Sequence, residues 1–307
     1  MGKLPSLSQP SFQPDSLLEY LPTVAEFCAE KMPERSWLCP RFTPTDSIIL
    51  LSGQKKRAQK TWFAMANAVS VSTGRVLGPF EPASAQPVLF VEEEGSRLRT
   101  KQRWEAICRA ASLETNDLTR LYFVFRRRVK LDDPRWVSAL VKKAKETRPS
   151  LVVFDALAYL KRGDENNLTE MLPVLDALYE IRGASAPNAS VMVLAHLDKA
   201  RGASPGLDID DQVRGSGVFT DAYDLHLALR RYASRGPLQL IIRARDEEEK
   251  YFQVTWKFEK NEEDKIWAAR LTALPLLPQD RDREAPETPA RKRSAKDELR
   301  QDSDPDK

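Results

Sequence analysis

The chain contains 307 residues, of which 41% are hydrophobic and 30% charged, and its formal net charge is +3. This balance is typical of a soluble globular protein with one large domain or two small ones, and it gives no global argument for nucleic-acid binding. Two histidines and three scattered cysteines argue against a structural zinc site and indicate free thiols in a reducing, cytoplasmic setting. The sequence lacks both an apolar run of roughly 18 residues and the charged-then-apolar order of a signal peptide, so no membrane anchor is expected.

The two ends of the chain differ in composition from its middle. Residues 1–15 are rich in Ser, Pro and Gln, which predicts a flexible N-terminus. A helical pattern of apolar residues then runs over residues 16–31. Residues 279–307 contain almost no apolar side chains and are predicted to form a disordered, charged tail. We therefore expect one folded domain over residues 16–278, with a helical lead-in at its start.

Strand and helix patterns alternate from residue 48 onward. Short apolar runs separated by helical patterns are typical of an α/β fold, with a mostly parallel sheet covered by helices on both faces. After residue 219 four apolar runs follow one another without helices, and we expect antiparallel strands that extend one edge of the sheet. The strand candidates are residues 48–51, 88–91, 121–125, 151–154, 191–195, 225–229, 238–244, 251–258 and 266–271. The helix candidates are residues 61–72, 97–111, 134–146 and 169–181.

The segment IILLSGQKKRAQKTW, residues 48–62, has the layout of a nucleotide-binding P-loop. A buried strand leads through a loop to a helix that begins at Lys60 and Thr61, so backbone N–H groups and the helix N-terminus would converge on phosphates. Lys60 is expected to contact the outer phosphates and Thr61 to hold magnesium, with Gly53, Gln59 and Trp62 completing the cofactor-binding stretch. The alternative is a lysine-rich turn that opens a surface helix.

The loop departs from the P-loop pattern in two places. The pattern places four residues between two glycines, whereas five residues follow Gly53 and Gln59 stands where the second glycine belongs. Glycine normally allows positive φ there and lets the backbone approach the phosphates without a Cβ in the way. We therefore expect Gln59 to crowd the loop, and the sequence is compatible both with a loop that closes around phosphate and with one that does not.

Polar side chains end three later strand candidates. Asp155 ends LVVFD, and a carboxylate there can hold magnesium through water. Glu93 and Glu94 follow the strand in VEEEG, and one of them, Glu94 by preference, is expected to orient or deprotonate an attacking water. His196 ends VLAH, where a polar side chain can sense the γ-phosphate. Each signal has an ordinary structural alternative, but the carboxyl ends of parallel strands share one sheet edge, so four such ends in order predict one triphosphate site.

With these residues the chain resembles the RepA-like branch of the RecA/DnaB superfamily, the ATPases related to plasmid hexameric helicases. The resemblance extends over residues 48–271 and is most specific in LVVFDALAYLKRGDENNLTEMLPVLDALYEI, residues 151–181. It continues through VMVLAHLDKARG and VRGSGVFTDAYDLHLALRR. The fold that it implies is a RecA-like P-loop NTPase core.

The resemblance also implies roles for single residues. Lys60 and Thr61 match the P-loop lysine and hydroxyl residue, and Asp155 matches the aspartate that supports magnesium. Glu94, or its neighbour Glu93, matches the catalytic glutamate.

Two further positions match the family's phosphate-contacting groups. His196 matches the second of two adjacent histidines, with Ala195 at the first position, and Arg214 matches the arginine of an Arg–Gly–Ser segment. In ring ATPases such an arginine can reach the nucleotide of the neighbouring subunit. The chain departs from the family at the second P-loop glycine, at the inserted loop residue and at the first histidine.

The activity implied by the resemblance is ATP hydrolysis with Mg²⁺ by a cytoplasmic, homo-oligomeric ring of the helicase type that acts on single-stranded DNA in replication or recombination. Basic segments at residues 126–130 and around Lys199, Arg201 and Arg214 are candidates for contacts with a phosphate backbone, although a solvated surface is the better explanation of the first. One alternative is a catalytically weakened or inactive relative that serves as a binding or assembly module, which Gln59 favours. Another is an ATP-dependent regulator or recombination mediator of the same fold.

Overall fold

The computed structural model describes residues 23–29, 36–55, 57–164, 167–197, 209–210, 213, 222–231, 237–245 and 247–276. The chain divides into two compact units, Met1–Ser36 and Trp37–Lys307. The predicted flexible N-terminus and charged tail lie outside the described residues, as do Lys199, Arg201 and Arg214.

The described helix of the first unit is α2 (Val24–Ala29), which falls within the helical segment predicted over residues 16–31. Thr23 and Glu26 form a capping box at its start. The Glu26 backbone N–H donates to the Thr23 hydroxyl at 3.2 Å, and the Thr23 backbone N–H donates to the Glu26 carboxylate at 2.8 Å.

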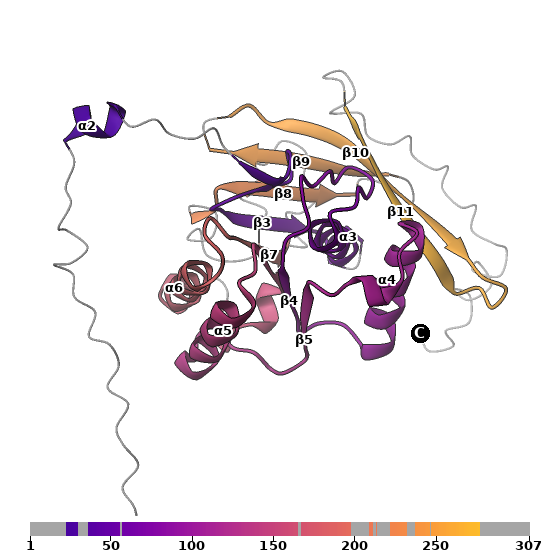
Figure 1. Ribbon diagram of the computed structural model, residues 1–307, viewed down its shortest axis with the longest axis horizontal. Coiled ribbons are helices and arrows are strands. Elements are labelled where there is room, and N and C mark those ends of the chain that lie inside the picture. Colours follow the sequence, from indigo (N-terminus) through magenta and orange to yellow (C-terminus); the bar gives the residue numbers. More distant parts are fainter. Residues whose placement is uncertain are drawn as a thin grey trace, which may run out of the picture. The chain divides into compact units, whose positions relative to one another are not determined.

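Within the described part of the second unit, nine strands form one sheet in the order β11-β10-β9-β8-β3-β7-β6-β4-β5 (Figure 1). The six strands from β8 to β5 in this order run parallel, and the remaining three continue the sheet in antiparallel fashion. The parallel strands are β3 (Ile48–Gly53), β4 (Val88–Glu92), β5 (Leu121–Phe125), β6 (Leu151–Asp155), β7 (Ser190–His196) and β8 (Leu225–Arg230). The antiparallel strands are β9 (Leu238–Ala244), β10 (Lys250–Lys260) and β11 (Ile266–Pro275). A separate two-stranded sheet, which the sequence patterns did not predict, joins β1 (Trp37–Cys39) and β2 (Thr43–Pro44).

The prediction for β8 was wrong in direction. The run at residues 225–229 was expected to be antiparallel, but β8 pairs with β3 in parallel register, with Ile49 opposite Leu225. A parallel partner requires a long crossover connection, and the interval between His196 and Leu225 provides the length without a helical sequence pattern that would have signalled it. The α/β fold class, with a mostly parallel sheet and antiparallel C-terminal strands, is confirmed.

Four helices in the described part of the chain cover the two faces of this sheet, as predicted. α3 and α4 lie on one face of the sheet, and α5 and α6 lie on the other (Figure 1). Side chains from α3 and α4 share one core with Ile49 and Leu51, whereas side chains from α5 and α6 share the other core with Ile48 and Leu50. This division follows from the alternation of side chains along a strand. The helices are α3 (Lys60–Thr73), α4 (Arg97–Ala110), α5 (Pro134–Thr147) and α6 (Leu168–Ala184). None of the described helices is long and apolar enough to cross a bilayer.

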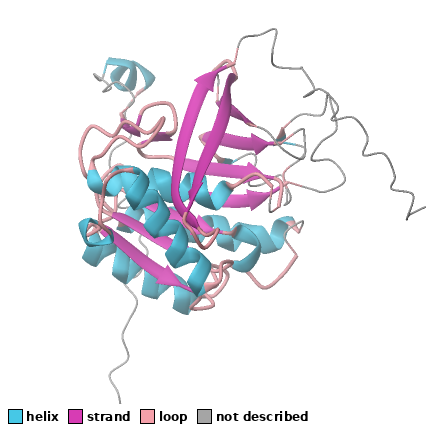
Figure 2. Ribbon diagram, turned by 90° about the vertical axis from the view of Figure 1, so that its right-hand side faces the viewer, coloured by secondary structure: helices cyan, strands magenta, loops and turns pink. Residues whose placement is uncertain are grey.

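The long pair β10 and β11 at the edge of the sheet curves toward α4 (Figures 1 and 2). The Arg109 side chain on α4 lies over the Trp267 ring of β11, with Cζ 3.9 Å from the ring centroid. Its Nη1 also donates to the Trp267 carbonyl oxygen at 3.0 Å. These contacts join the C-terminal strands to the helix that follows β4.

Candidate functional site

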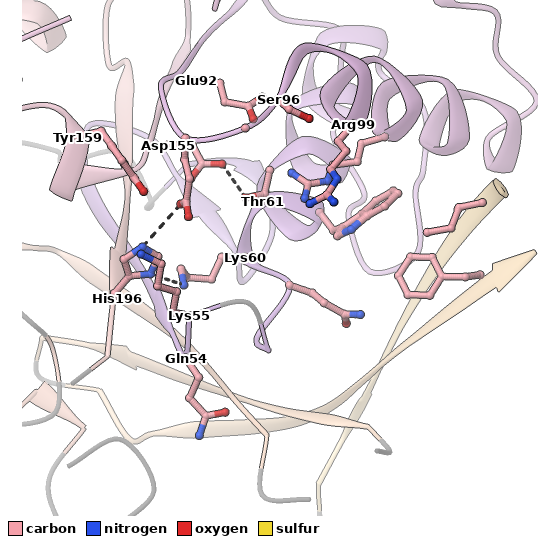
Figure 3. A pocket seen from close by; sticks show the side chains of 17 residues that line it. Gln54, Lys55, Lys60, Thr61, Glu92, Ser96, Arg99, Asp155, Tyr159 and His196 are labelled. Atoms are coloured by element: carbon pink, nitrogen blue, oxygen red, sulfur yellow. Dashed lines mark hydrogen bonds and ion pairs between the residues drawn. The ribbon is translucent and has the colours of Figure 1, made fainter. Parts of the chain in front are cut away.

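A cavity of about 950 Å³ lies at the carboxyl ends of β3, β4, β6 and β7 (Figure 3). The residues predicted from the strand ends that line it are Gln59, Lys60, Thr61, Trp62, Glu94, Asp155 and His196. The other lining residues are Gln54, Lys55, Glu92, Gly95, Ser96, Arg99, Arg103, Tyr159, Phe258 and Ile266. The polar residues at the strand ends therefore meet at one place in the fold.

Lys60 begins α3 and is buried at the base of the cavity, with 6% of its surface exposed. Its Nζ donates to the Gly53 carbonyl oxygen at 2.7 Å and lies 3.1 Å from His196 Nδ1. Burial lowers the pKa of Lys60 to about 8, while the charges of Asp155 and Glu94 act in the opposite direction. A protonated Lys60 must donate to Nδ1, so a neutral His196 carries its own proton on Nε2, the atom 3.6 Å from Glu94 Oε2.

Gln59 takes the backbone conformation that a P-loop glycine would supply. Its φ is 56° and its ψ is 30°, in the left-handed region. Its side chain lines the cavity, and Gln59 Oε1 accepts a hydrogen bond from Arg231 Nη2 at 3.4 Å. Arg231 Nε also donates to the Arg57 carbonyl oxygen at 3.2 Å, which ties the altered loop to the end of β8.

Gly53 serves a packing purpose at the start of the loop. A Cβ on this residue would lie 2.6 Å from Ala58 Cβ and 2.7 Å from the Leu229 carbonyl oxygen. Both distances are well below van der Waals contact, so a larger residue would force the inserted loop away from β8.

Thr61 and Asp155 are joined directly across the cavity (Figure 3). The Thr61 hydroxyl donates to Asp155 Oδ2 at 2.7 Å. Asp155 is 1% exposed, and its Oδ1 has no hydrogen-bond partner among the described groups. Burial raises the pKa of Asp155 to about 6, and the hydrogen bond from Thr61 opposes this rise.

This pair fits a magnesium ion by the chemistry of its donors. A hydroxyl beside a buried carboxylate with an unsatisfied oxygen is the arrangement that a hard divalent cation with oxygen ligands would complete. Among the described residues no group of three or more His, Cys, Asp or Glu side chains could hold a metal without further ligands. An ion here would therefore depend on phosphate oxygens and water.

The two candidate glutamates are placed in different environments. Glu93 does not line the cavity, because its carboxylate accepts the backbone N–H groups of Arg127, Arg128 and Val129 at 3.0, 3.0 and 3.1 Å. It thus fixes the loop after β5. Glu94 does line the cavity, and its side chain is 29% exposed.

Glu92 is a buried carboxylate of the site that the sequence analysis missed. It ends β4 and pairs in register with Asp155, the last residue of β6. Burial raises the pKa of Glu92 to about 7, with a smaller contribution from the Asp155 charge, while the hydrogen bond from Thr100 acts in the opposite direction. The alternation of side chains along β4 would have identified it. Val88 and Phe90 pack on the face that α3 and α4 cover, and Glu92, two residues after Phe90, points to the same face.

An aromatic wall bounds another part of the cavity. The Trp62 ring lies 5.2 Å from the Phe258 ring, and Arg103 Cζ lies 5.8 Å from the centroid of the Trp62 ring. Phe258 and Ile266 come from β10 and β11, so the curved C-terminal strands reach the site. Of these residues, the sequence indicated only Trp62. Phe258 and Ile266 reach the cavity because β10 and β11 curve toward it, and this tertiary contact leaves no pattern in the sequence.

The chain is similar to one protein family and to several solved structures. Residues 13–202 match the AAA domain family, and no curated protein matches the chain. Similar solved structures include a KaiC-like protein from the hyperthermophilic archaeon Pyrococcus horikoshii OT3, at 14% identity and a TM-score of 0.46, covering 76% of this chain and 91% of that one. The RadB recombinase is also similar, at 19% identity and a TM-score of 0.46, covering 69% of this chain and 88% of that one. Since the family match spans more than half of the sequence, the chain belongs to the AAA domain family.

Proposed function

We propose that the chain binds ATP with Mg²⁺ in this cavity and hydrolyses it. The observation that carries the proposal is the meeting of Lys60, Thr61, Glu94, Asp155 and His196 around one cavity of about 950 Å³. These side chains supply a buried cation, a metal-holding pair and a carboxylate for water, which together are the groups that phosphoryl transfer to water requires.

Lys60 would contact the phosphates. Its hydrogen-bond partners, the Gly53 carbonyl oxygen and His196 Nδ1, carry no negative charge, so its own charge is available to an anion. A pKa of about 8 leaves Lys60 mostly protonated at neutral pH, and an adjacent phosphate would raise that pKa further. Thr61 and Asp155 would hold Mg²⁺, which when bound neutralises phosphate charge.

Glu94 would orient the attacking water. Its Oε2 lies 3.6 Å from His196 Nε2, and His196 Nδ1 lies 3.1 Å from Lys60 Nζ. A phosphate that touches Lys60 and His196 therefore sits beside the Glu94 carboxylate, which can accept a hydrogen bond from water. We propose that Glu94, and not Glu93, has this role, because Glu93 is engaged by three backbone N–H groups.

The aromatic wall would contact the nucleobase. Trp62 and Phe258 present rings, Ile266 presents an aliphatic surface, and Arg103 adds a cation above Trp62. A flat, apolar base stacks favourably on such groups. The polar lining at the P-loop and the aromatic lining beside it together match the two parts of a nucleotide.

We further propose that the protein acts on single-stranded DNA as a homo-oligomer of the RepA-like type. Support comes from the sequence resemblance, in which Arg214 would complete the nucleotide site of a neighbouring copy. The exposed basic side chains of Arg126, Arg127 and Arg128, which follow β5, provide a surface that could contact a phosphate backbone.

The catalytic proposal is tested by measuring phosphate release at saturating Mg²⁺ and ATP, with and without single-stranded DNA. Lys60→Ala and Glu94→Gln should each lower the rate by about 100-fold or more, because each removes a group that acts on the reacting phosphate or water. Lys142→Ala removes an exposed lysine of α5 and serves as the matched control. Equal rates in wild type and Lys60→Ala would refute the catalytic assignment. Nucleotide binding without any turnover in wild type would favour the binding or assembly module instead.

A further inference from the structure

Glu92 lies fully buried beside the predicted metal pair. It is 0% exposed, and it stands opposite Asp155 in the register of β4 and β6. Neighbouring parallel strands are about 4.8 Å apart, so the two carboxylates start from adjacent backbone positions. The alternation along each strand directs both side chains to the face that α3 and α4 cover.

The surroundings of Glu92 hold its carboxylate in one position. The Thr100 hydroxyl, on α4, donates to Glu92 Oε1 at 2.9 Å. Gly95 leaves the space that this carboxylate fills, because a Cβ there would lie 1.9 Å from Glu92 Oε1 and 2.6 Å from Thr100 Oγ1. Gly95 and the Thr100 hydroxyl thus hold one oxygen of Glu92 in place, as expected for a preorganised binding site.

The other oxygen of Glu92 is left unsatisfied. Glu92 Oε2 has no hydrogen-bond partner among the described groups, and the same is true of Asp155 Oδ1. Both residues line the same cavity. Two buried carboxylates that each keep an unpaired oxygen are costly in a folded protein unless a ligand completes them.

We propose that Glu92 is a second metal-holding carboxylate, which joins Thr61 and Asp155 in binding the divalent cation that enters with the nucleotide. This inference rests on the proposed nucleotide-binding function and adds a residue to it. Magnesium in nucleotide sites is held by one or two protein carboxylates together with substrate phosphates. A cation bound by Asp155 alone would leave the charge of the buried Glu92 carboxylate uncompensated. A cation bound by both carboxylates would satisfy the unpaired oxygens of Glu92 and Asp155.

Glu92→Gln tests the assignment, because glutamine keeps the shape and the hydrogen bond from Thr100 but removes the charge. ADP binding is measured by calorimetry without metal and with Mg²⁺, and bound Mn²⁺ is counted by electron paramagnetic resonance with and without ADP. Glu81→Gln, which removes an exposed carboxylate, is the matched control. Gly95→Ala is a second variant that displaces the Glu92 carboxylate without removing it.

In wild type and Glu81→Gln, the metal should strengthen ADP binding, and Mn²⁺ should bind together with ADP. In Glu92→Gln and Gly95→Ala, the affinity for the metal in the presence of ADP should fall by about 10- to 100-fold, while metal-free ADP binding stays close to wild type. Metal-free Glu92→Gln should also melt at or above the wild-type temperature, because the change removes repulsion between two buried carboxylates.

Three results would overturn the inference, and they are distinguishable. If Glu92→Gln and wild type bind Mn²⁺ equally in the presence of ADP, Glu92 has no metal-holding role and the nucleotide-binding proposal stands. If Glu92→Gln melts well below wild type and its metal affinity is unchanged, Glu92 serves only to fix Thr100 and α4. If wild type binds no ADP with or without metal, the proposed function fails, and the role of Glu92 fails with it.

Discussion

The hydroxyl of Thr61 donates a hydrogen bond of 2.7 Å to Asp155, although the two residues are 94 positions apart in the sequence. This contact joins the first turn of α3 to the end of β6, and it lies beside the buried ammonium group of Lys60. A fold that brings these groups together has the layout of a P-loop site, even though its loop has one more residue than the pattern and no second glycine.

The backbone at Gln59 gives a stability prediction. Gln59 has φ of 56°, where glycine is unstrained and a β-branched residue is strongly disfavoured. Gln59→Val should therefore be less stable than Gln59→Gly by about 2 kcal/mol in the free energy of unfolding. Urea unfolding of the two variants measures the difference. Equal stability would mean that residue 59 does not hold the left-handed conformation in solution.

The two neighbouring glutamates should respond to mutation in opposite ways. Glu93→Ala removes the acceptor of three backbone N–H groups and should cost about 3 kcal/mol in the free energy of unfolding, with little loss of activity per folded molecule. Glu94→Gln should leave stability within about 0.5 kcal/mol of wild type, because the residue is partly exposed, and should lower turnover instead. Thermal melts and turnover of the same preparations check both. The reverse pattern would transfer the water-orienting role to Glu93.

A buried polar chain beside the P-loop strand predicts a pH dependence of stability. His226 Nε2 lies 2.7 Å from Ser52 Oγ, and His226 Nδ1 lies 2.7 Å from Asp210 Oδ1. Burial lowers the pKa of His226 below 6.5, although Asp210 opposes this shift. The unfolded state therefore binds a proton as the pH falls below 6.5, while the folded state does not.

The free energy of unfolding should consequently fall as the pH drops from 6.5, by up to about 1.4 kcal/mol per pH unit. Asp210 adds a second loss at lower pH, because its folded pKa is about 2 and its ordinary value is 3.8. Chemical unfolding at a series of pH values measures the slope. In His226→Gln the loss between pH 6.5 and about 5 should shrink, since the titrating imidazole is gone. An unchanged slope in that variant would assign the pH dependence to other groups.

The sequence was most informative where chemistry and strand geometry coincide. Lys60, Thr61, Asp155 and His196 could be placed together because buried parallel strands with polar last residues must end at one edge of a sheet. Glu94 followed from the same argument. The run of three glutamates in VEEEG did not show where the strand ends, and β4 in fact includes Glu92.

Other features depend on tertiary contacts, which the periodicity of the sequence does not reveal. β8 runs parallel to β3, but the sequence before it has no helical pattern, so an antiparallel meander was the simpler expectation. The approach of Phe258 and Ile266 to Trp62 arises from the curvature of β10 and β11 over α4. The side chain of Gln59 accepts a hydrogen bond from Arg231, a residue 172 positions away, which no local rule could identify.

Calorimetric titration of a non-hydrolysable ATP analogue with Mg²⁺, into wild type, Lys60→Ala and Lys142→Ala, tests the central claim most directly. The account predicts saturable binding at one site per chain in wild type and in Lys142→Ala, with affinity at least about tenfold weaker in Lys60→Ala, because a buried charge at the phosphates is lost. The absence of saturable binding in wild type, or equal affinity in Lys60→Ala, would contradict it.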